Sequence, residues 1–182
     1  MFKKYVLSVC LSFVIYLLAY TFIHEMGHGL IGIFAGGRIE RLVLGFNAKV
    51  YISNTNYNEF TLPLMNIMGM LLPYFVFLIV TLFYDRNINL ILYNVFYGIY
   101  VFGILGSMTP WILIPIISIF TTPPPGDDVT KFLSNSGLNP IIIAAVGLLM
   151  LASFLLVAFK KGIINNFIDI IKNLRNCQKA TV

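Results

Sequence analysis

The chain has 182 residues, of which 59% are hydrophobic and only 10% are charged. About a quarter of the residues in a soluble domain are charged, so this composition excludes an ordinary soluble fold and indicates that lipid solvates most of the chain. The net charge of the chain is +5. Its 12 Lys and Arg residues are spread thinly along the sequence, which excludes a nucleic-acid-binding module. Two cysteines, Cys10 and Cys177, provide neither a disulfide framework nor a metal-binding pair.

Four apolar runs are long enough to cross a membrane, which takes about 20 helical residues. The third run contains Pro110 and Pro115 and is too long for one straight span, so we expect it to bend or break. The fourth begins with Asn139 as a helix cap and Pro140 in the first turn. The sequence therefore predicts an all-α polytopic membrane protein whose core, residues 1–160, contains about four transmembrane helices, at residues 5–35, 62–84, 88–120 and 139–159.

Two segments outside these runs have a different pattern. Residues 38–60 contain two strand-like stretches around a short connection, which predicts a β-hairpin-like segment at the membrane face, with a plain interfacial loop as the alternative. Residues 161–182 place apolar side chains at helical spacing, with basic residues on the opposite side. We expect this basic, amphipathic tail to lie along the bilayer surface.

The first run contains the motif H-E-x-x-H at residues 24–28, and His24 and His28 are the only histidines in the chain. Because residues i and i+4 share one helical face, both imidazoles can bind a single metal ion. Nitrogen ligands combined with a carboxylate favour zinc. An ionisable group at membrane depth costs at least about 2.5 kcal/mol, so we expect one catalytic Zn²⁺ per chain; a structural zinc or a polar helix contact is the alternative. Zinc lowers the pKa of a bound water to about 7, and Glu25 can then take its proton.

The third protein ligand should be a carboxylate, because no further histidine is present. Asp127 and Asp128 are favoured because they follow a rigid Pro-rich turn and because two further crossings return the chain to the side of the two histidines. Either aspartate can also cap a short helix reaching about Asn135, and one can cap while the other binds the metal. The complete set of candidates is Glu40, Glu59, Asp85, Asp127, Asp128 and Asp169.

These features resemble the site-2 protease family of intramembrane zinc metallopeptidases, more closely its small, bare-core members. The resemblance covers residues 21–129: the H-E-x-x-H motif followed by small residues, a strand-like segment, an Asn and Gly segment at residues 66–69, and a later Pro/Gly-Asp turn. It implies hydrolysis of a peptide bond in or beside the membrane, with His24, His28 and an aspartate as zinc ligands and Glu25 as base. It also implies that the strand-like segment holds the substrate by strand addition.

The sequence departs from the family pattern at the aspartate, which the family usually follows with glycine. Here the segment is Gly126-Asp127-Asp128-Val129, and reading it as Gly-x-Asp favours Asp128, with Asp127 retained as the alternative. The orientation also conflicts. Eight basic residues lie on the membrane side that carries the termini, and four lie on the other side. This difference favours cytoplasmic termini and a site near the outer face. The resemblance instead implies a site nearer the cytosol.

We therefore expect an intramembrane zinc metalloprotease of the cell membrane that acts on a membrane-spanning protein or peptide. A non-proteolytic zinc-binding membrane scaffold, or a degenerate family member, is the alternative. A membrane protease that takes its third ligand from a glutamate on a later helix is disfavoured, because no glutamate follows Glu59.

Overall fold

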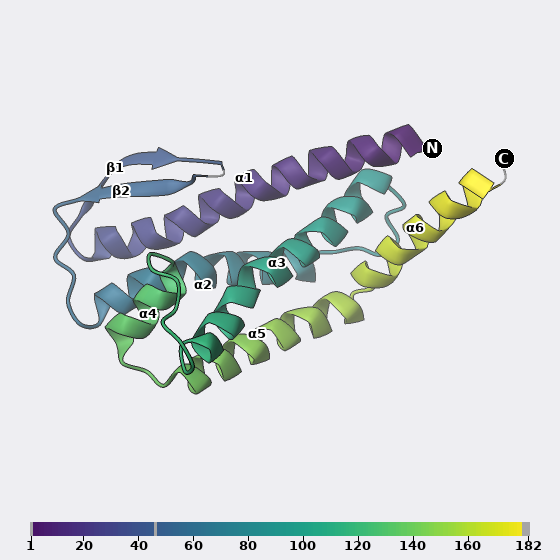
Figure 1. Ribbon diagram of the computed structural model, residues 1–182. Coiled ribbons are helices and arrows are strands. Elements are labelled where there is room, and N and C mark those ends of the chain that lie inside the picture. The colour runs from purple at the N-terminus through teal and green to yellow at the C-terminus, as the bar shows by residue number, and fades with distance from the viewer. Residues whose placement is uncertain (1, 46, 180–182) are drawn as a thin grey trace.

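The computed structural model describes residues 2–45 and 47–179, which form six helices and one two-stranded sheet (Figure 1). Four of these helices are long and apolar enough to cross a membrane, which indicates a membrane protein. Successive helices of this set run in opposite directions, because each connection between them reverses the chain. These four are α1 (Phe2–Phe34), α2 (Thr61–Leu82), α3 (Ile91–Ile117) and α5 (Pro140–Lys160).

The bundle has an aromatic and aliphatic core and an apolar outer surface. Helix α1 packs against α2 and α3, and α5 packs mainly against α3. Tyr100, Ile104 and Phe154 are almost fully buried between the helices. On the outside, Leu149 is 70% exposed and Leu156 is 60% exposed. Such an apolar surface would be unfavourable in water and matches the hydrocarbon of a bilayer.

Helix α3 is one continuous helix of 27 residues, so of the two expected alternatives, a bend or a break, the break is wrong. The helix is also shorter than the predicted 88–120, because residues 88–90 belong to the connection before it and residues 118–120 form a turn. Pro110 and Pro115 both lie inside it. Hydroxyl groups of Ser107 and Thr109 donate hydrogen bonds to carbonyls of the preceding turn, and packing against α1 and α5 supports the helix on two sides. Tertiary contacts therefore outweigh the helix-breaking tendency of proline here.

The segment after α1 is a β-hairpin, so its interpretation as a plain loop is wrong. Strands β1 (Arg38–Val43) and β2 (Lys49–Ser53) pair antiparallel. The hairpin lies on α1 because two glycines leave room for its side chains (Figure 1). A Cβ atom on Gly29 would lie 2.9 Å from Ile39 Cδ1, and one on Gly32 would lie 2.5 Å from Ile52 Cδ1. The small residues after the H-E-x-x-H motif therefore form the seat of the hairpin.

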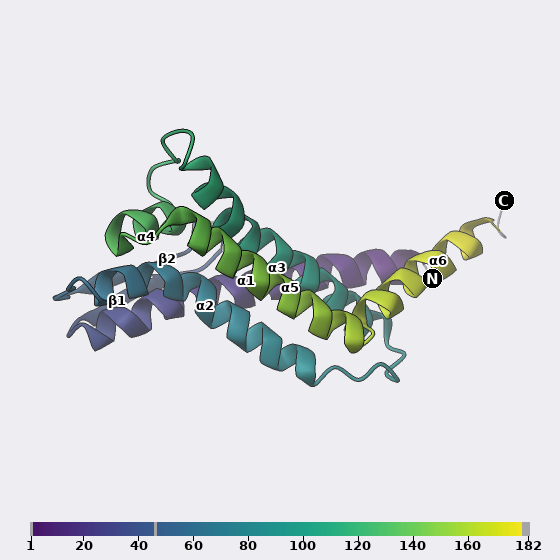
Figure 2. The ribbon, with the colours of Figure 1, turned by 90° about the horizontal axis from the view of Figure 1, so that it is seen from below.

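Two shorter helices complete the chain. Helix α4 (Asp128–Ser136) lies beside the hairpin end of the bundle, and α6 (Ile163–Lys179) extends from the opposite end (Figure 2). The capping prediction for α5 is confirmed, because the Asn139 side chain accepts a hydrogen bond from the Ile141 amide at 2.9 Å. The predicted tail helix is present as α6 over the described part of the chain.

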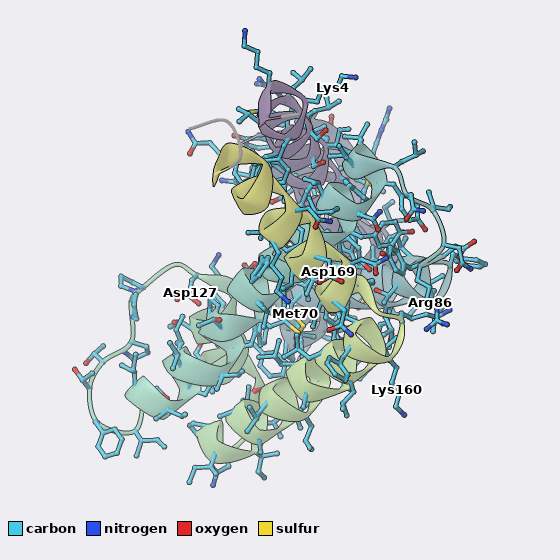
Figure 3. The ribbon with its side chains drawn as sticks, turned by 90° about the vertical axis from the view of Figure 1, so that its right-hand side faces the viewer. Lys4, Met70, Arg86, Asp127, Lys160 and Asp169 are labelled. Carbon is cyan, nitrogen blue, oxygen red and sulfur yellow. The ribbon has the colours of Figure 1, made fainter. Side chains whose placement is uncertain are left out.

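The two ends of the bundle differ in charge. Lys4, Arg86 and Lys160 lie at the end that carries the N-terminus and α6 (Figure 3). The chain crosses the bundle four times within the described residues, which leaves the predicted division of eight basic residues against four unchanged. The expectation of cytoplasmic termini rests on this division.

Candidate metal centre

Both histidines of the motif face the same point on the far half of α1. The Nε2 atoms of His24 and His28 are 3.1 Å apart, as expected for residues one helical turn apart. His28 Nδ1 donates to the backbone carbonyl of Met65 on α2 at 2.7 Å. This bond leaves His28 Nε2 unprotonated in the neutral ring and fixes its direction, which is how metal-binding histidines are usually oriented. The Nδ1 atom of His24 is buried and has no hydrogen-bond partner among the described residues.

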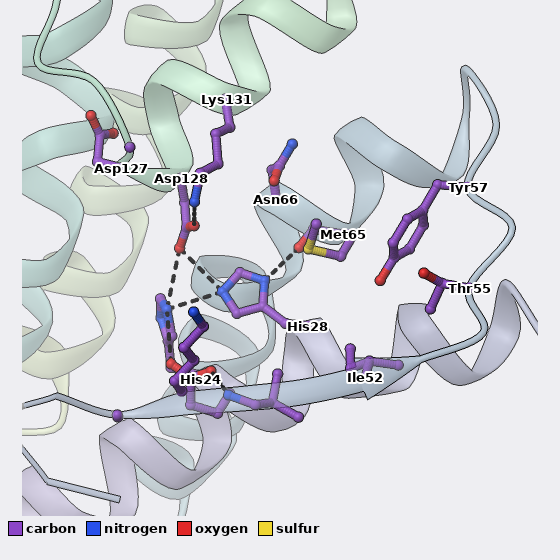
Figure 4. A pocket seen from close by; sticks show the side chains of 15 residues that line it. His24, His28, Ile52, Thr55, Tyr57, Met65, Asn66, Asp127, Asp128 and Lys131 are labelled. Atoms are coloured by element: carbon purple, nitrogen blue, oxygen red, sulfur yellow. Dashed lines mark hydrogen bonds and ion pairs between the residues drawn. The ribbon is translucent and has the colours of Figure 1, made fainter. Parts of the chain in front are cut away.

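An aspartate 100 residues further along the chain completes the group. Asp128 Oδ2 lies 3.2 Å from His24 Nε2 and 3.1 Å from His28 Nε2 (Figure 4). Asp128 is the first residue of α4. The packing of α4 against α2 places the N-terminus of α4 over the two histidines. Helix α1 therefore contributes two imidazoles and helix α4 one carboxylate to the same group.

The neighbouring Asp127 has a different role. Its side chain caps α4 by accepting hydrogen bonds from the amides of Val129 at 2.8 Å and Thr130 at 3.0 Å. Asp127 also lines the cavity of the site but is not part of the group of His24, His28 and Asp128. Asp127 thus caps α4, whereas Asp128 approaches the two histidines.

The other four candidate carboxylates lie outside this group. Glu40 accepts a hydrogen bond from Ser53 within the hairpin, and Glu59 is exposed in the connection to α2. Asp85 caps a turn by accepting from the Asn87 amide, and Asp169 pairs with Lys172 on α6. None of the four belongs to the described cluster that could hold a metal ion.

The donor set fits a small divalent cation. Two ligands bonded to a tetrahedral zinc at about 2.0–2.1 Å lie about 3.3 Å from each other. The three donor atoms of His24, His28 and Asp128 are separated by 3.1 to 3.2 Å. Two imidazole nitrogens and one carboxylate oxygen are also the ligand types that suit zinc and related transition metals. The group could therefore hold a metal ion, and its chemistry alone does not distinguish zinc from its neighbours.

The electrostatics of Asp128 favour its ionised form. Burial opposes ionisation, but hydrogen bonds and charge interactions with His24 and His28 outweigh burial and lower the pKa of the carboxyl below its usual value. Lys131, one turn along α4, places its Nζ 3.8 Å from Asp128 Oδ1. Asp128 can thus offer Oδ2 to a metal ion while Oδ1 faces the ammonium group.

Glu25 lies beside the metal-binding group but outside it. Its Oε1 is 4.0 Å from His24 Nε2, and its Oε2 accepts a hydrogen bond of 2.7 Å from the Val50 amide of β2. The side chain is only 9% exposed. A carboxylate in this position can meet a water molecule at the metal instead of the metal itself.

Two glycines allow α1 and α2 to touch at the site. A Cβ on Gly27 would lie 2.2 Å from the Met68 carbonyl oxygen, so the two backbones are in contact there. A Cβ on Gly69 would lie 2.4 Å from His28 Nε2 and 2.9 Å from His24 Cε1. Gly69 therefore forms the floor of the metal-binding group. The sequence marks residues 66–69 only through the family resemblance, and it gives no signal for the Met65 carbonyl.

The group opens into a cavity of about 640 Å³. One wall is β2, including Val50 and Ile52; the other is formed by α2 and α4, including Asn66 and Lys131 (Figure 4). The cavity is large enough for several residues of an extended peptide beside the histidines. Comparison of the chain with protein-family models, curated proteins and solved structures finds no match.

Proposed function

We propose that this protein is an intramembrane zinc metalloprotease. One observation carries the proposal: Asp128 of the short helix α4 lies 3.1 to 3.2 Å from His24 and His28, which with Glu25 belong to α1, a helix long and apolar enough to cross a membrane. The resemblance of the same residues to the site-2 protease family supports the same function. The proposed cofactor is one Zn²⁺ per chain, held by His24, His28 and Asp128.

The residues of the chain suit hydrolysis of a peptide bond. A bound zinc would act as a Lewis acid toward water and the substrate carbonyl. Glu25 accepts a proton from the attacking water while the water oxygen bonds to the carbonyl carbon of the substrate. Glu25 then donates that proton to the leaving amine as the C–N bond breaks. Low exposure of Glu25 excludes bulk water from this transfer. Lys131 lines the cavity and places its ammonium group beside Asp128 Oδ1.

The proposed substrate is a membrane-spanning protein or peptide. The cavity lies at the hairpin end of a bundle whose outer surface is apolar, so a segment that leaves the bilayer at that end would meet the site directly. Hydrolysis needs an extended backbone, and the outer edge of β2 borders the cavity. Strand addition to this edge at positions other than Val50, whose amide donates to Glu25, would hold an unwound segment beside the metal-binding group. The proposed location is the cell membrane.

The rival function, a zinc-binding scaffold without protease activity, is less well supported by the geometry. A structural zinc site is usually closed by four protein ligands, whereas this group has three and faces a cavity.

Glu25→Gln separates the two functions. Purified wild type and Glu25→Gln would be compared for zinc content and for cleavage of a single-span reporter protein tagged at both ends. The proposal predicts cleavage by wild type and at least a 100-fold loss in Glu25→Gln at equal zinc content. Equal cleavage by the two proteins, or no cleavage by zinc-loaded wild type, would reject it.

A further inference from the structure

The carboxylate of Glu25 is held by the backbone of the hairpin. The Val50 amide donates to Glu25 Oε2 at 2.7 Å, and the remaining oxygen, Oε1, lies on the side of His24 Nε2, 4.0 Å away. A hydrogen bond from a backbone amide to a poorly hydrated carboxyl group is costly to lose, because the unpaired group would stay buried. The bond thus fixes which oxygen of Glu25 faces the metal-binding group.

This amide is available because of the register of the hairpin. Val50 pairs with Leu42 across the two strands. In an antiparallel pair, the N–H and C=O groups of one residue point either both toward the partner strand or both away from it. The Val50 amide points away from β1, because it donates to Glu25, so the outer edge of β2 faces α1 at this position.

Packing keeps the hairpin in this place. Gly29 and Gly32 follow Glu25 by four and seven residues, so all three lie on one face of α1. Ile39 and Ile52 of the hairpin lie against the two glycines, in space that a Cβ would occupy. The same face of α1 therefore carries the carboxylate and the seat of the strand that orients it.

We propose that the backbone amide of Val50 is a positioning group for Glu25: it holds Oε2 so that Oε1 is directed at the water that the base deprotonates. This inference rests on the proposed protease function. It assigns the hairpin a role in catalysis that is separate from holding a substrate. The strand sets the orientation of the base in every turnover, whichever sequence is cleaved.

Proline at position 50 tests the proposal because it removes the amide, and Val50→Ala controls for loss of the valine side chain, which lies near Gly29 and lines the cavity. The Val50 amide takes no part in the pairing with β1, and proline is tolerated at such strand positions. Val50→Pro is expected to lower kcat about 10- to 100-fold, with KM within about twofold of wild type and one zinc per chain retained. Val50→Ala restores the amide and should recover most of the lost activity. Leu44→Pro, in the exposed hairpin connection, is the control for proline itself and should cleave like wild type.

A second measurement does not depend on activity. Amide hydrogen exchange of ¹⁵N-valine-labelled protein in detergent would be compared between wild type and Glu25→Ala. The Val50 amide is expected to exchange at least about 10-fold faster in Glu25→Ala, because its acceptor is lost. This comparison decides the question if Val50→Pro fails to fold or to bind zinc.

The outcomes are distinct. Normal kcat in zinc-loaded Val50→Pro, or unchanged exchange at Val50 in Glu25→Ala, would overturn the positioning role while leaving the protease proposal intact. Absence of cleavage by zinc-loaded wild type would instead overturn the proposed function. Loss of kcat in Val50→Pro with recovery in Val50→Ala supports both.

Discussion

The floor of the metal-binding group offers a sharp test of the geometry. In Gly69→Ala, the added methyl carbon would lie 2.4 Å from His28 Nε2 and 2.6 Å from His28 Cε1. Non-bonded heavy atoms are most stable about 3.5–4.0 Å apart, so the His28 ring or the α2 backbone must move by about 1 Å. The ring is anchored by its hydrogen bond to the Met65 carbonyl, one turn before Gly69 on α2. A shift large enough to relieve the overlap weakens that bond and turns Nε2 away from Asp128.

The expected effect is on metal affinity. Loss of the hydrogen bond that orients a metal-binding histidine typically costs 10- to 100-fold in affinity. We therefore expect the Kd for zinc to rise about 10- to 100-fold in Gly69→Ala, which corresponds to about 1.4–2.8 kcal/mol. Alanine within a helix is otherwise favoured over glycine by about 0.4–1 kcal/mol, so a general weakening of α2 is not expected.

The assay is a competitive zinc titration against a chelator of known affinity, in detergent micelles, with helix content followed by circular dichroism. Gly106→Ala is the matched control, because Gly106 lies inside α3 and a Cβ there would meet nothing within 4 Å. Gly106→Ala should bind zinc like wild type. If Gly69→Ala also binds zinc with unchanged affinity, the position of α2 beneath the two imidazoles is wrong.

Three further predictions follow from the same arrangement. Asp128→Ala should lose zinc, whereas Asp127→Ala should retain it and lose about 1 kcal/mol of stability with the α4 cap; equal zinc contents would contradict the division of roles. Lowering the pH from 7 to 5 should release zinc, because protons compete for the two imidazoles while Asp128, with its lowered pKa, stays ionised; a titration that shows no release would count against histidine ligands. With the native cysteines replaced, an impermeant thiol reagent added to intact cells should label Thr122→Cys and spare Asn87→Cys, and the reverse pattern would reject cytoplasmic termini.

The membrane spans and the pair of histidines are readable from sequence because each depends on local pattern. Apolar runs of about 20 residues need no knowledge of the fold, and the spacing of His24 and His28 places them on one helical face. The caps of α4 and α5 are local for the same reason: Asp127 and Asn139 each bind amides within three residues. These are the parts of the structure that composition and spacing predict well.

The remaining parts depend on contacts between distant segments. Whether Asp127 or Asp128 approaches the histidines is decided by the packing of α4 on α2, and the sequence leaves both open. The continuity of α3 through Pro110 likewise reflects its neighbours more than its own residues. The Val50 amide belongs to the backbone, so no residue type announces it. A sequence motif does not indicate which backbone groups form hydrogen bonds or where helices approach closely at glycine. These features nevertheless set the geometry of the site.

We propose that His24, His28 and Asp128 hold one metal ion where helix α4 meets the histidine-bearing part of the apolar helix α1. The most direct measurement is the elemental metal content of the purified protein in detergent, with His24→Ala prepared in parallel. One zinc per chain is expected in wild type and almost none in His24→Ala, with the helix content unchanged. A wild-type protein that contains no stoichiometric metal, even after incubation with zinc, would contradict it.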